Sequence, residues 1–219
     1  MLIWIFTHDL RYRFKCLYFA SQLQMEKLKA LLTRKNIINV VFILLMLVLI
    51  INPAAKALLI RGFIAVGIMR PPTQSEKVAT STPSVNITLR QPNGEVLQSE
   101  KLKGKVLIMN FWATWCPPCI AEMPSINKMY LQYKNNSNLV VIPIDADNDV
   151  SKSTAFMQNK GYSLPVYTLA GPLPTGLVSN AIPTTIIIDK KGRVVARHEG
   201  AADYSSEAFY EYLDGLLKE

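Results

Sequence analysis

The residues of this chain best suited to chemistry are two cysteines, Cys116 and Cys119, in a C-x-x-C arrangement. They follow an apolar run, and the pattern from Ile120 onward is helical, so Cys116 lies where a strand gives way to a helix. Free backbone N–H groups and the helix dipole stabilise an anion at that position. In such motifs the pKa of a thiol falls from about 8.5 to roughly 3.5–7.5. The spacing therefore predicts a thiolate at Cys116 and a redox-active disulfide with Cys119, one turn along.

The two intervening residues, Pro117 and Pro118, refine this prediction. If Cys116 is the N-cap, the prolines take the first two helical positions, where a missing N–H is tolerated. The N–H of Cys119 is then the nearest backbone donor to the Cys116 sulfur. We expect the cap position to lower the thiol pKa, but by less than a motif richer in donors would.

Two other readings of the polar residues fit less well. A zinc site needs four ligands, and Cys16, His8 and His198 are not spaced as a second pair. The acidic run from Asp145 to Asp149 resembles the start of a calcium loop. Its sixth position would be Val150 instead of glycine, and its twelfth Phe156 instead of glutamate, so a solvated loop and helix cap are expected. No metal and no cofactor are predicted.

The elements around the cysteines alternate between strand and helix. Hydrophobic patterning predicts buried strands at Val106–Trp112, Leu139–Ile144 and 164–169, and helices from Cys119 to about Tyr133 (bent at Pro124), at 151–160 and at 206–218. Turn signals predict hairpins over 85–98 and 184–198. This order indicates an α/β fold.

With these elements in place, the segment from Asn110 to Cys119, followed by Glu122-Met123-Pro124, resembles the membrane-anchored thioredoxin-like thiol:disulfide oxidoreductases of the TlpA/ResA type. The resemblance runs from about Val85 to the C-terminus. It implies a thioredoxin-like central mixed sheet flanked by helices, with an N-terminal β-hairpin. It also implies that Cys116 is the attacking cysteine and Cys119 the resolving one.

The resemblance further implies that Ile182-Pro183 is a loop with a cis proline facing the cysteines. A cis bond there would leave the Ile182 backbone free to pair with an extended substrate, and Trp115 and Pro117 complete the predicted substrate-binding surface. Ordinary thioredoxins carry a buried acid that assists proton transfer at the position that Asn110 occupies here. The amide side chain of Asn110 cannot transfer a proton. Glu122 matches a family glutamate and is the candidate for that role, although the helix dipole alone also favours glutamate in a first turn.

The net charge of +8 is not spread evenly along the chain. Residues 1–36 carry +5 and residues 37–84 carry +3, whereas the 13 basic and 13 acidic residues from Val85 onward cancel. The folded part therefore has no excess positive charge for phosphates, and nucleic-acid binding is not expected.

A membrane anchor explains the basic N-terminal part better. Ile37–Ile51 is apolar except for Asn39 and follows a basic flank, which the positive-inside rule keeps in the cytoplasm. Fifteen residues span only about 23 Å of a hydrocarbon core near 30 Å, and a second apolar stretch, 57–69, could extend the membrane contact or lie along the surface. The alternatives are a signal peptide cleaved near Ala55-Lys56-Ala57 and a buried helix of a soluble domain.

Four segments are thus predicted. Residues 1–36 form a cytoplasmic basic segment, of which 1–24 are absent if Met25 is the initiator, and residues 37–69 form the anchor and membrane-proximal segment. Residues 70–84, which contain Pro71, Pro72 and Pro83, form a linker, and residues 85–219 form the thioredoxin-like domain. Cys16 is assigned no function.

The predicted function is reduction of disulfides in exported proteins by an enzyme of the inner membrane, with its catalytic domain on the periplasmic side and a membrane electron donor to re-reduce it. A thiol oxidase or isomerase remains open, because the sequence does not give the reduction potential. A peroxiredoxin-like peroxidase shares the fold but uses a lone attacking cysteine. A non-catalytic interaction module would not need an intact C-x-x-C motif.

Overall fold

The computed structural model describes residues 33–67, 69, 86–177 and 181–219. It divides into two compact units, Met1–Ile51 and Asn52–Glu219. The predictions for residues 1–32, including Met25 and Cys16, and for the linker at 70–84 lie outside the described residues.

The described part of the first unit is a helix, α2 (Arg34–Ile51), that contains the predicted apolar segment. Its large apolar side chains, from Ile37 to Ile51, are exposed or nearly so along the whole helix. Within the described residues, no single helix has the length and apolar character to cross a membrane. The bent pair Lys35–Ile51 and Pro53–Ala65 meets that test when taken together.

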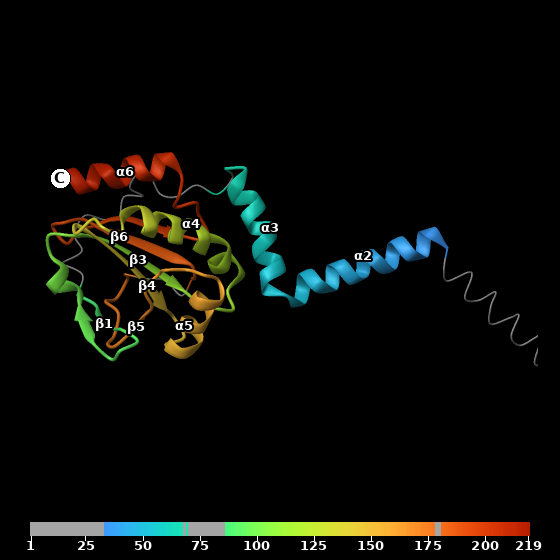
Figure 1. Cartoon of the computed structure of the whole chain (residues 1–219), viewed down its shortest axis with the longest axis horizontal. Helices are drawn as coiled ribbons and strands as arrows, with labels where there is room; N and C mark the ends of the chain where they lie inside the picture. The colour runs from blue at the N-terminus through green and yellow to red at the C-terminus, as the bar shows by residue number, and fades with distance from the viewer. Residues whose placement is uncertain (1–32, 68, 70–85, 178–180) are drawn as a thin grey trace, which may run out of the picture. The chain divides into compact units, whose positions relative to one another are not determined.

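The second unit is built on one mixed sheet of seven strands in the part of the chain that the structure describes, in the order β2-β1-β5-β4-β3-β6-β7 (Figure 1). The central strand β3 runs parallel to β4, and β5 continues this parallel set, whereas the remaining pairs are antiparallel. The strands are β1 (Thr88–Arg90), β2 (Val96–Gln98), β3 (Val106–Trp112), β4 (Leu139–Asp145), β5 (Tyr167–Leu169), β6 (Thr184–Ile188) and β7 (Val194–Glu199).

Alternation along β3 divides the core between the two faces of the sheet. Ile108 and Trp112 pack with apolar residues of α4 (Pro117–Tyr133), α5 (Val150–Asn159) and α6 (Glu207–Lys218). Met109 and Phe111 point to the opposite face, where they pack with Leu89 and with side chains from the segment after β5. Because β3 is buried on both faces, its sequence is an unbroken apolar run apart from Asn110.

The mixed sheet flanked by helices confirms the predicted arrangement, with small differences. The strand expected at 164–169 is limited to β5, and a 3₁₀ turn, η1 (Ser99–Leu102), was not expected. The acidic run is not wholly a solvated loop: Asp145 is buried at the end of β4, where its carboxylate accepts the N–H groups of Asp147 and Asp149. Asp149 caps α5, as predicted, by accepting the Lys152 N–H.

A helix ahead of the sheet, α3 (Pro53–Ala65), belongs to the same compact unit. The Asn52 side chain caps its N-terminus, and Pro53 stands at its first position. One face of α3 packs on α4, the helix that begins at Cys116 (Figure 1).

Candidate active site

Cys116 is the N-cap residue of α4, and its backbone is extended (φ −84°, ψ 108°). Its sulfur accepts a hydrogen bond from the Cys119 N–H at 3.3 Å, the one donor that the two prolines leave within the first turn. The two sulfurs are joined by a disulfide of 2.07 Å. The predicted cap geometry is therefore confirmed, and a thiolate at Cys116 would sit at the positive end of the α4 dipole.

The surroundings of the two sulfurs differ in exposure. Cys119 is completely buried, whereas Cys116 keeps a small exposed fraction beside the half-buried prolines and Trp115, which is 55% exposed. A substrate disulfide therefore reaches the pair from the side of Cys116. This is the arrangement needed for one sulfur to attack and the other to resolve.

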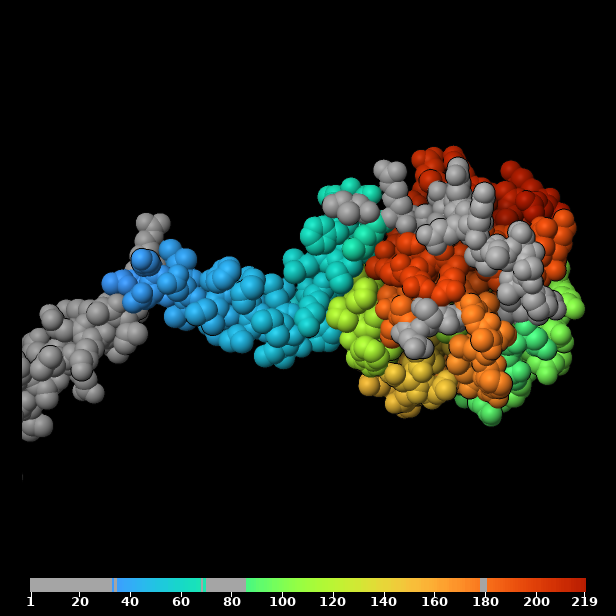
Figure 2. Space-filling view, turned by 180° about the vertical axis from the view of Figure 1, so that it is seen from behind, coloured from blue at the N-terminus to red at the C-terminus, as the bar shows by residue number. Residues whose placement is uncertain are grey.

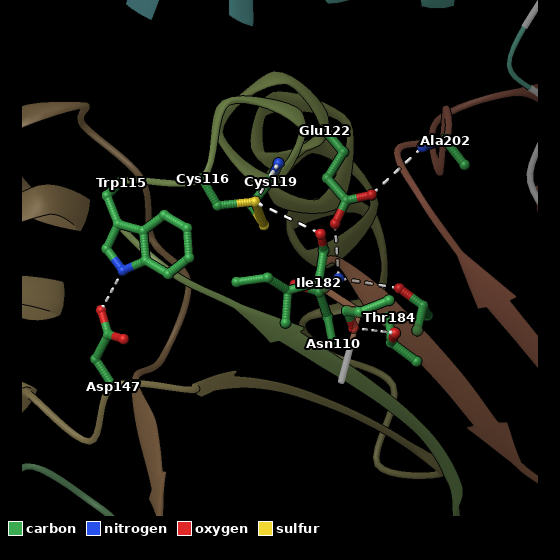
Figure 3. Close-up of a disulfide and its surroundings, with 11 residues drawn as sticks. Asn110, Trp115, Cys116, Cys119, Glu122, Asp147, Ile182, Thr184 and Ala202 are labelled. Atoms are coloured by element: carbon green, nitrogen blue, oxygen red, sulfur yellow. Dashed lines mark hydrogen bonds between the residues drawn. A yellow bond between two sulfur atoms is a disulfide. The ribbon is translucent and has the colours of Figure 1, made fainter. Parts of the chain in front are cut away.

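The loop before β6 faces the disulfide, because β6 is antiparallel to β3 and begins beside the end of β3 that leads to Cys116. The Ile182–Pro183 peptide bond is cis, as the resemblance implies, and the Ile182 carbonyl oxygen lies 3.8 Å from the Cys116 sulfur (Figure 3). Pro183 is buried and Ile182 is half-buried. The backbone of Ile182 thus lines the approach to Cys116.

Trp115 is held in place from another loop. Its indole N–H donates to a carboxylate oxygen of Asp147 at 2.7 Å. Asp147 follows β4, whose last residue Asp145 pairs with Trp112 at the end of β3, so the sheet brings the acidic loop beside the turn before Cys116. Figure 3 shows the indole ring next to Cys116, with Asp147 on its far side.

Glu122 lies in the second turn of α4 and is fully buried. Its carboxylate accepts one hydrogen bond from the Asn110 side-chain amide at 2.8 Å and another from the Ala202 N–H at 3.3 Å. Burial raises the pKa of Glu122 from 4.5 to about 8, and the two hydrogen bonds offset only part of that rise. At neutral pH the group is therefore mostly a carboxylic acid.

Asn110 is oriented by its neighbour in the sheet. It stands opposite Thr185 in the β3–β6 register, so both side chains project from the same face, and its amide also donates to the Thr185 hydroxyl at 2.9 Å. Tyr204 is buried near the same group: burial, and then the charge of Glu122, raise the pKa of this phenol well above its usual value. The buried surroundings of Glu122 and Tyr204 thus favour the neutral, protonated form of each group.

The structure brings all seven predicted site residues, Trp115, Cys116, Pro117, Cys119, Glu122, Ile182 and Pro183, to the region around the start of α4. Sequence reasoning missed three contributors, Asp147, Thr185 and Ala202. Only the acidic cluster gave a signal for the first of them, and the other two lie 75 and 80 residues from their partners. Among the described residues, no group of three or more His, Cys, Asp or Glu side chains could hold a metal ion.

The chain is similar to proteins of known family over most of this unit. Residues 77–212 match the family model described as Redoxin. The chain is 32% identical over 173 residues to the thiol-disulfide oxidoreductase ResA of Bacillus thuringiensis, a match that covers 78% of this chain and 91% of that protein. It belongs to the ResA-type thiol-disulfide oxidoreductases.

Other members of the ResA type and solved structures agree. ResA of Bacillus subtilis is 30% identical over 122 residues, covering 55% of this chain and 67% of that protein. A structure described as a thiol-disulfide oxidoreductase from Bacteroides vulgatus superposes with a TM-score of 0.55 at 26% identity, covering 65% of this chain and 99% of that one. DsbE of Chlorobium tepidum, at 24% identity, shares the fold with a TM-score of 0.54 over 63% of this chain and 97% of that one. This ResA-type chain is a thioredoxin-like protein-disulfide oxidoreductase, and its substrates are disulfide-bearing proteins.

Proposed function

We propose that the chain is a membrane-tethered reductase of disulfides in exported proteins, working through the Cys116–Cys119 couple. The observation that carries the proposal is the unequal setting of the two sulfurs. Cys116 caps α4 at the open side of the pair, and Cys119 is sealed behind it. Only one of them can meet a folded substrate.

In the first step, the Cys116 thiolate attacks one sulfur of the substrate disulfide. A mixed disulfide forms, and the other substrate sulfur leaves as a thiolate that takes a proton from water. Trp115 and Pro117 border the attacking sulfur, and the Ile182 backbone lies within 3.8 Å of it. An extended substrate segment would lie along Ile182-Pro183, with its disulfide over Cys116.

In the second step, Cys119 displaces the substrate, and its proton must leave first. Glu122 lies one turn beyond Cys119 on α4 and has a pKa of about 8. Its ionised form accepts the Cys119 proton, and the Cys119 thiolate attacks the Cys116 sulfur. The second substrate sulfur leaves as a thiolate and takes a proton from water, so that the reduced substrate departs as a dithiol. The same carboxylic acid can return a proton when a membrane electron donor re-reduces the pair.

The tether is supported by α2, whose apolar side chains are exposed along the helix, and by the basic residues that precede it. The positive-inside rule assigns such a basic flank to the cytoplasmic side of a membrane, which supports a periplasmic location for the disulfide. Reduction at that face needs a reductant from the membrane, because glutathione and thioredoxin work in the cytoplasm.

Direction is tested by the reduction potential of the full-length chain in detergent micelles, equilibrated against dithiothreitol and glutathione. A potential near about −270 mV or lower is expected for a reductase. A value near about −120 mV would make the enzyme a thiol oxidant, and the proposed direction would be wrong. The Cys119→Ser variant, which cannot form the internal disulfide, is the control for the signal.

A further inference from the structure

Helix α3 is apolar on two opposite faces. Ala57 and Ile64 are buried on one face, against Ile120, Ala121 and Ala201 of the redox unit. The other face exposes four large apolar side chains, Leu58, Leu59, Phe63 and Val66, by 52 to 71%. A helix on a water-exposed surface carries polar groups along its outer face, whereas the exposed side of α3 carries one, Lys56.

The inner face of α3 is joined to α4 by a hydrogen bond to a carbonyl that has no N–H partner within α4. In a helix, the carbonyl of residue 120 accepts the N–H of residue 124, but Pro124 has no N–H to donate. The Arg61 guanidinium donates to this Ile120 carbonyl oxygen at 3.0 Å. Arg61 thus supplies the hydrogen-bond donor that Pro124 lacks. The carbonyl that accepts it belongs to Ile120, the residue after Cys119.

The position of α3 in the chain indicates what covers its outer face. Asn52 alone separates it from α2, which is apolar and exposed over its length. Lys56, near the start of α3, is exposed and suits the boundary between lipid tails and anionic headgroups. Each of these two consecutive helices therefore exposes apolar side chains of the kind that lipid covers.

We propose that α3 is a docking helix whose outer face lies in the lipid surface of a bilayer while its inner face, locked by Arg61, holds the redox helix α4 beside the membrane. The inference rests on the proposed membrane attachment. The inference adds that direct contact between α3 and the bilayer, beyond the connection through the chain, holds the redox unit at the membrane. The disulfide then stays at a fixed depth, where a membrane-bound reductant can reach it.

Photo-crosslinking of the full chain in vesicles of phosphatidylethanolamine and phosphatidylglycerol tests the outer face. Benzoylphenylalanine replaces Phe63 in α3, Phe42 in α2 or Val96 in strand β2, in separate variants. Val96 is the matched control, because its exposed fraction, 50%, is close to the 52% of Phe63. We expect lipid adducts from the labels at 63 and 42, and adducts at background level from the label at 96.

The outcomes separate the two proposals. Adducts from position 42 but none above background from position 63 would overturn the docking helix and leave the tether intact. An absence of adducts from position 42 would overturn the membrane attachment itself. Adducts between position 63 and a second protein copy would show that protein, not lipid, covers the outer face, and would also overturn the inference.

Hydrogen exchange of the same full-length protein in vesicles tests the lock. Arg61→Met removes the donor to Ile120, and we expect exchange of the α3 amides to rise roughly tenfold or more, because a hydrogen bond from a charged donor is lost. Lys152→Met is the control, since it removes a charge from an exposed position of α5, outside α3 and its lipid-facing side. Equal exchange in the two variants would overturn the role of Arg61. Turnover of a small soluble disulfide checks that both variants are folded.

Discussion

Cys116 and Glu122 lie two turns apart on α4, and their surroundings favour opposite charge states. The Cys116 sulfur accepts a backbone N–H at the positive end of the helix, which favours its anion. Glu122 is buried inside the unit, and this burial favours its neutral acid. One helix thus supplies a nucleophile and a proton-transfer group, and the environment of each, more than its residue type, assigns its role.

The largest expected effect comes from replacing one cysteine of the pair and keeping the other. Cys119→Ser keeps the attacking thiolate but removes the group that resolves the mixed disulfide. We expect turnover to fall below detection and a covalent adduct with a protein substrate to accumulate, visible by non-reducing electrophoresis. Cys116→Ser is the control and should give no adduct. Adducts of Cys116→Ser equal to those of Cys119→Ser would reverse the assignment of attacker and resolver.

Glu122→Gln should slow the resolving step by about 10²-fold, the usual scale of a lost general base. In the wild type, the resolving rate should rise with pH through about 8, as Glu122 ionises and becomes able to accept the Cys119 proton. The glutamine variant should lack that rise. Stopped-flow measurement of product release between pH 6 and 9 tests this, and a retained inflection near pH 8 would exclude Glu122 from the proton transfer.

The same substitution should change how stability depends on pH. The pKa of Glu122 is about 8 in the folded chain and 4.5 in its ordinary state, so between these values the folded form binds more protons. Its contribution to stability is complete below about pH 4.5 and is lost as pH rises through 8. We expect the wild type to lose a few kcal/mol more than Glu122→Gln between pH 5 and 9, measured by urea unfolding. Parallel pH curves would contradict the burial argument.

For Cys116, the informative variant is Pro118→Ala, which restores an N–H at the second position of α4. An N–H at that position can donate a hydrogen bond to the N-cap side chain. The added donor should lower the Cys116 pKa and stabilise the reduced form. The reduction potential should rise by about 30–60 mV, the equivalent of one hydrogen bond to a charged group. Pro117→Ala is the matched control, because the first helical N–H does not reach the cap. Equal potentials in the two variants would contradict this picture of the cap.

The smallest effect is expected at Trp115. Asp147→Asn leaves an acceptor for the indole N–H but removes the charge, whereas Asp147→Ala removes both. We expect Asp147→Ala to raise the KM for a protein substrate a few-fold with kcat unchanged, because a hydrogen bond exposed to solvent contributes only about 1 kcal/mol. Asp147→Asn should behave nearly as the wild type. A fall in kcat alone would mean that Asp147 does not act by orienting Trp115.

The comparison also shows what could be predicted from the sequence. The setting of Cys116 was predictable because a strand, a turn and two prolines at a helix start are all local. The proton-transfer role of Glu122 was only a candidate, because the burial that raises its pKa is not local. The groups that contact its carboxylate, Asn110 from β3 and Ala202 from the segment before α6, are distant in the sequence. The loop at 145–149 was read as solvated, since an acidic run carries no sign that its first member closes a buried strand. The Arg61 contact likewise joins residues 59 positions apart.

The order in which Cys116 and Glu122 lose their protons tests the central claim most directly. Both can be followed by ¹³C NMR in the reduced full-length protein labelled at cysteine Cβ and glutamate Cδ. In ordinary surroundings a glutamate ionises at about 4.3 and a cysteine at about 8.5. We expect the reverse order here, with Cys116 ionising first and Glu122 only near pH 8 or above. Ionisation of Glu122 near pH 4.5, ahead of Cys116, would contradict the assignment of both roles.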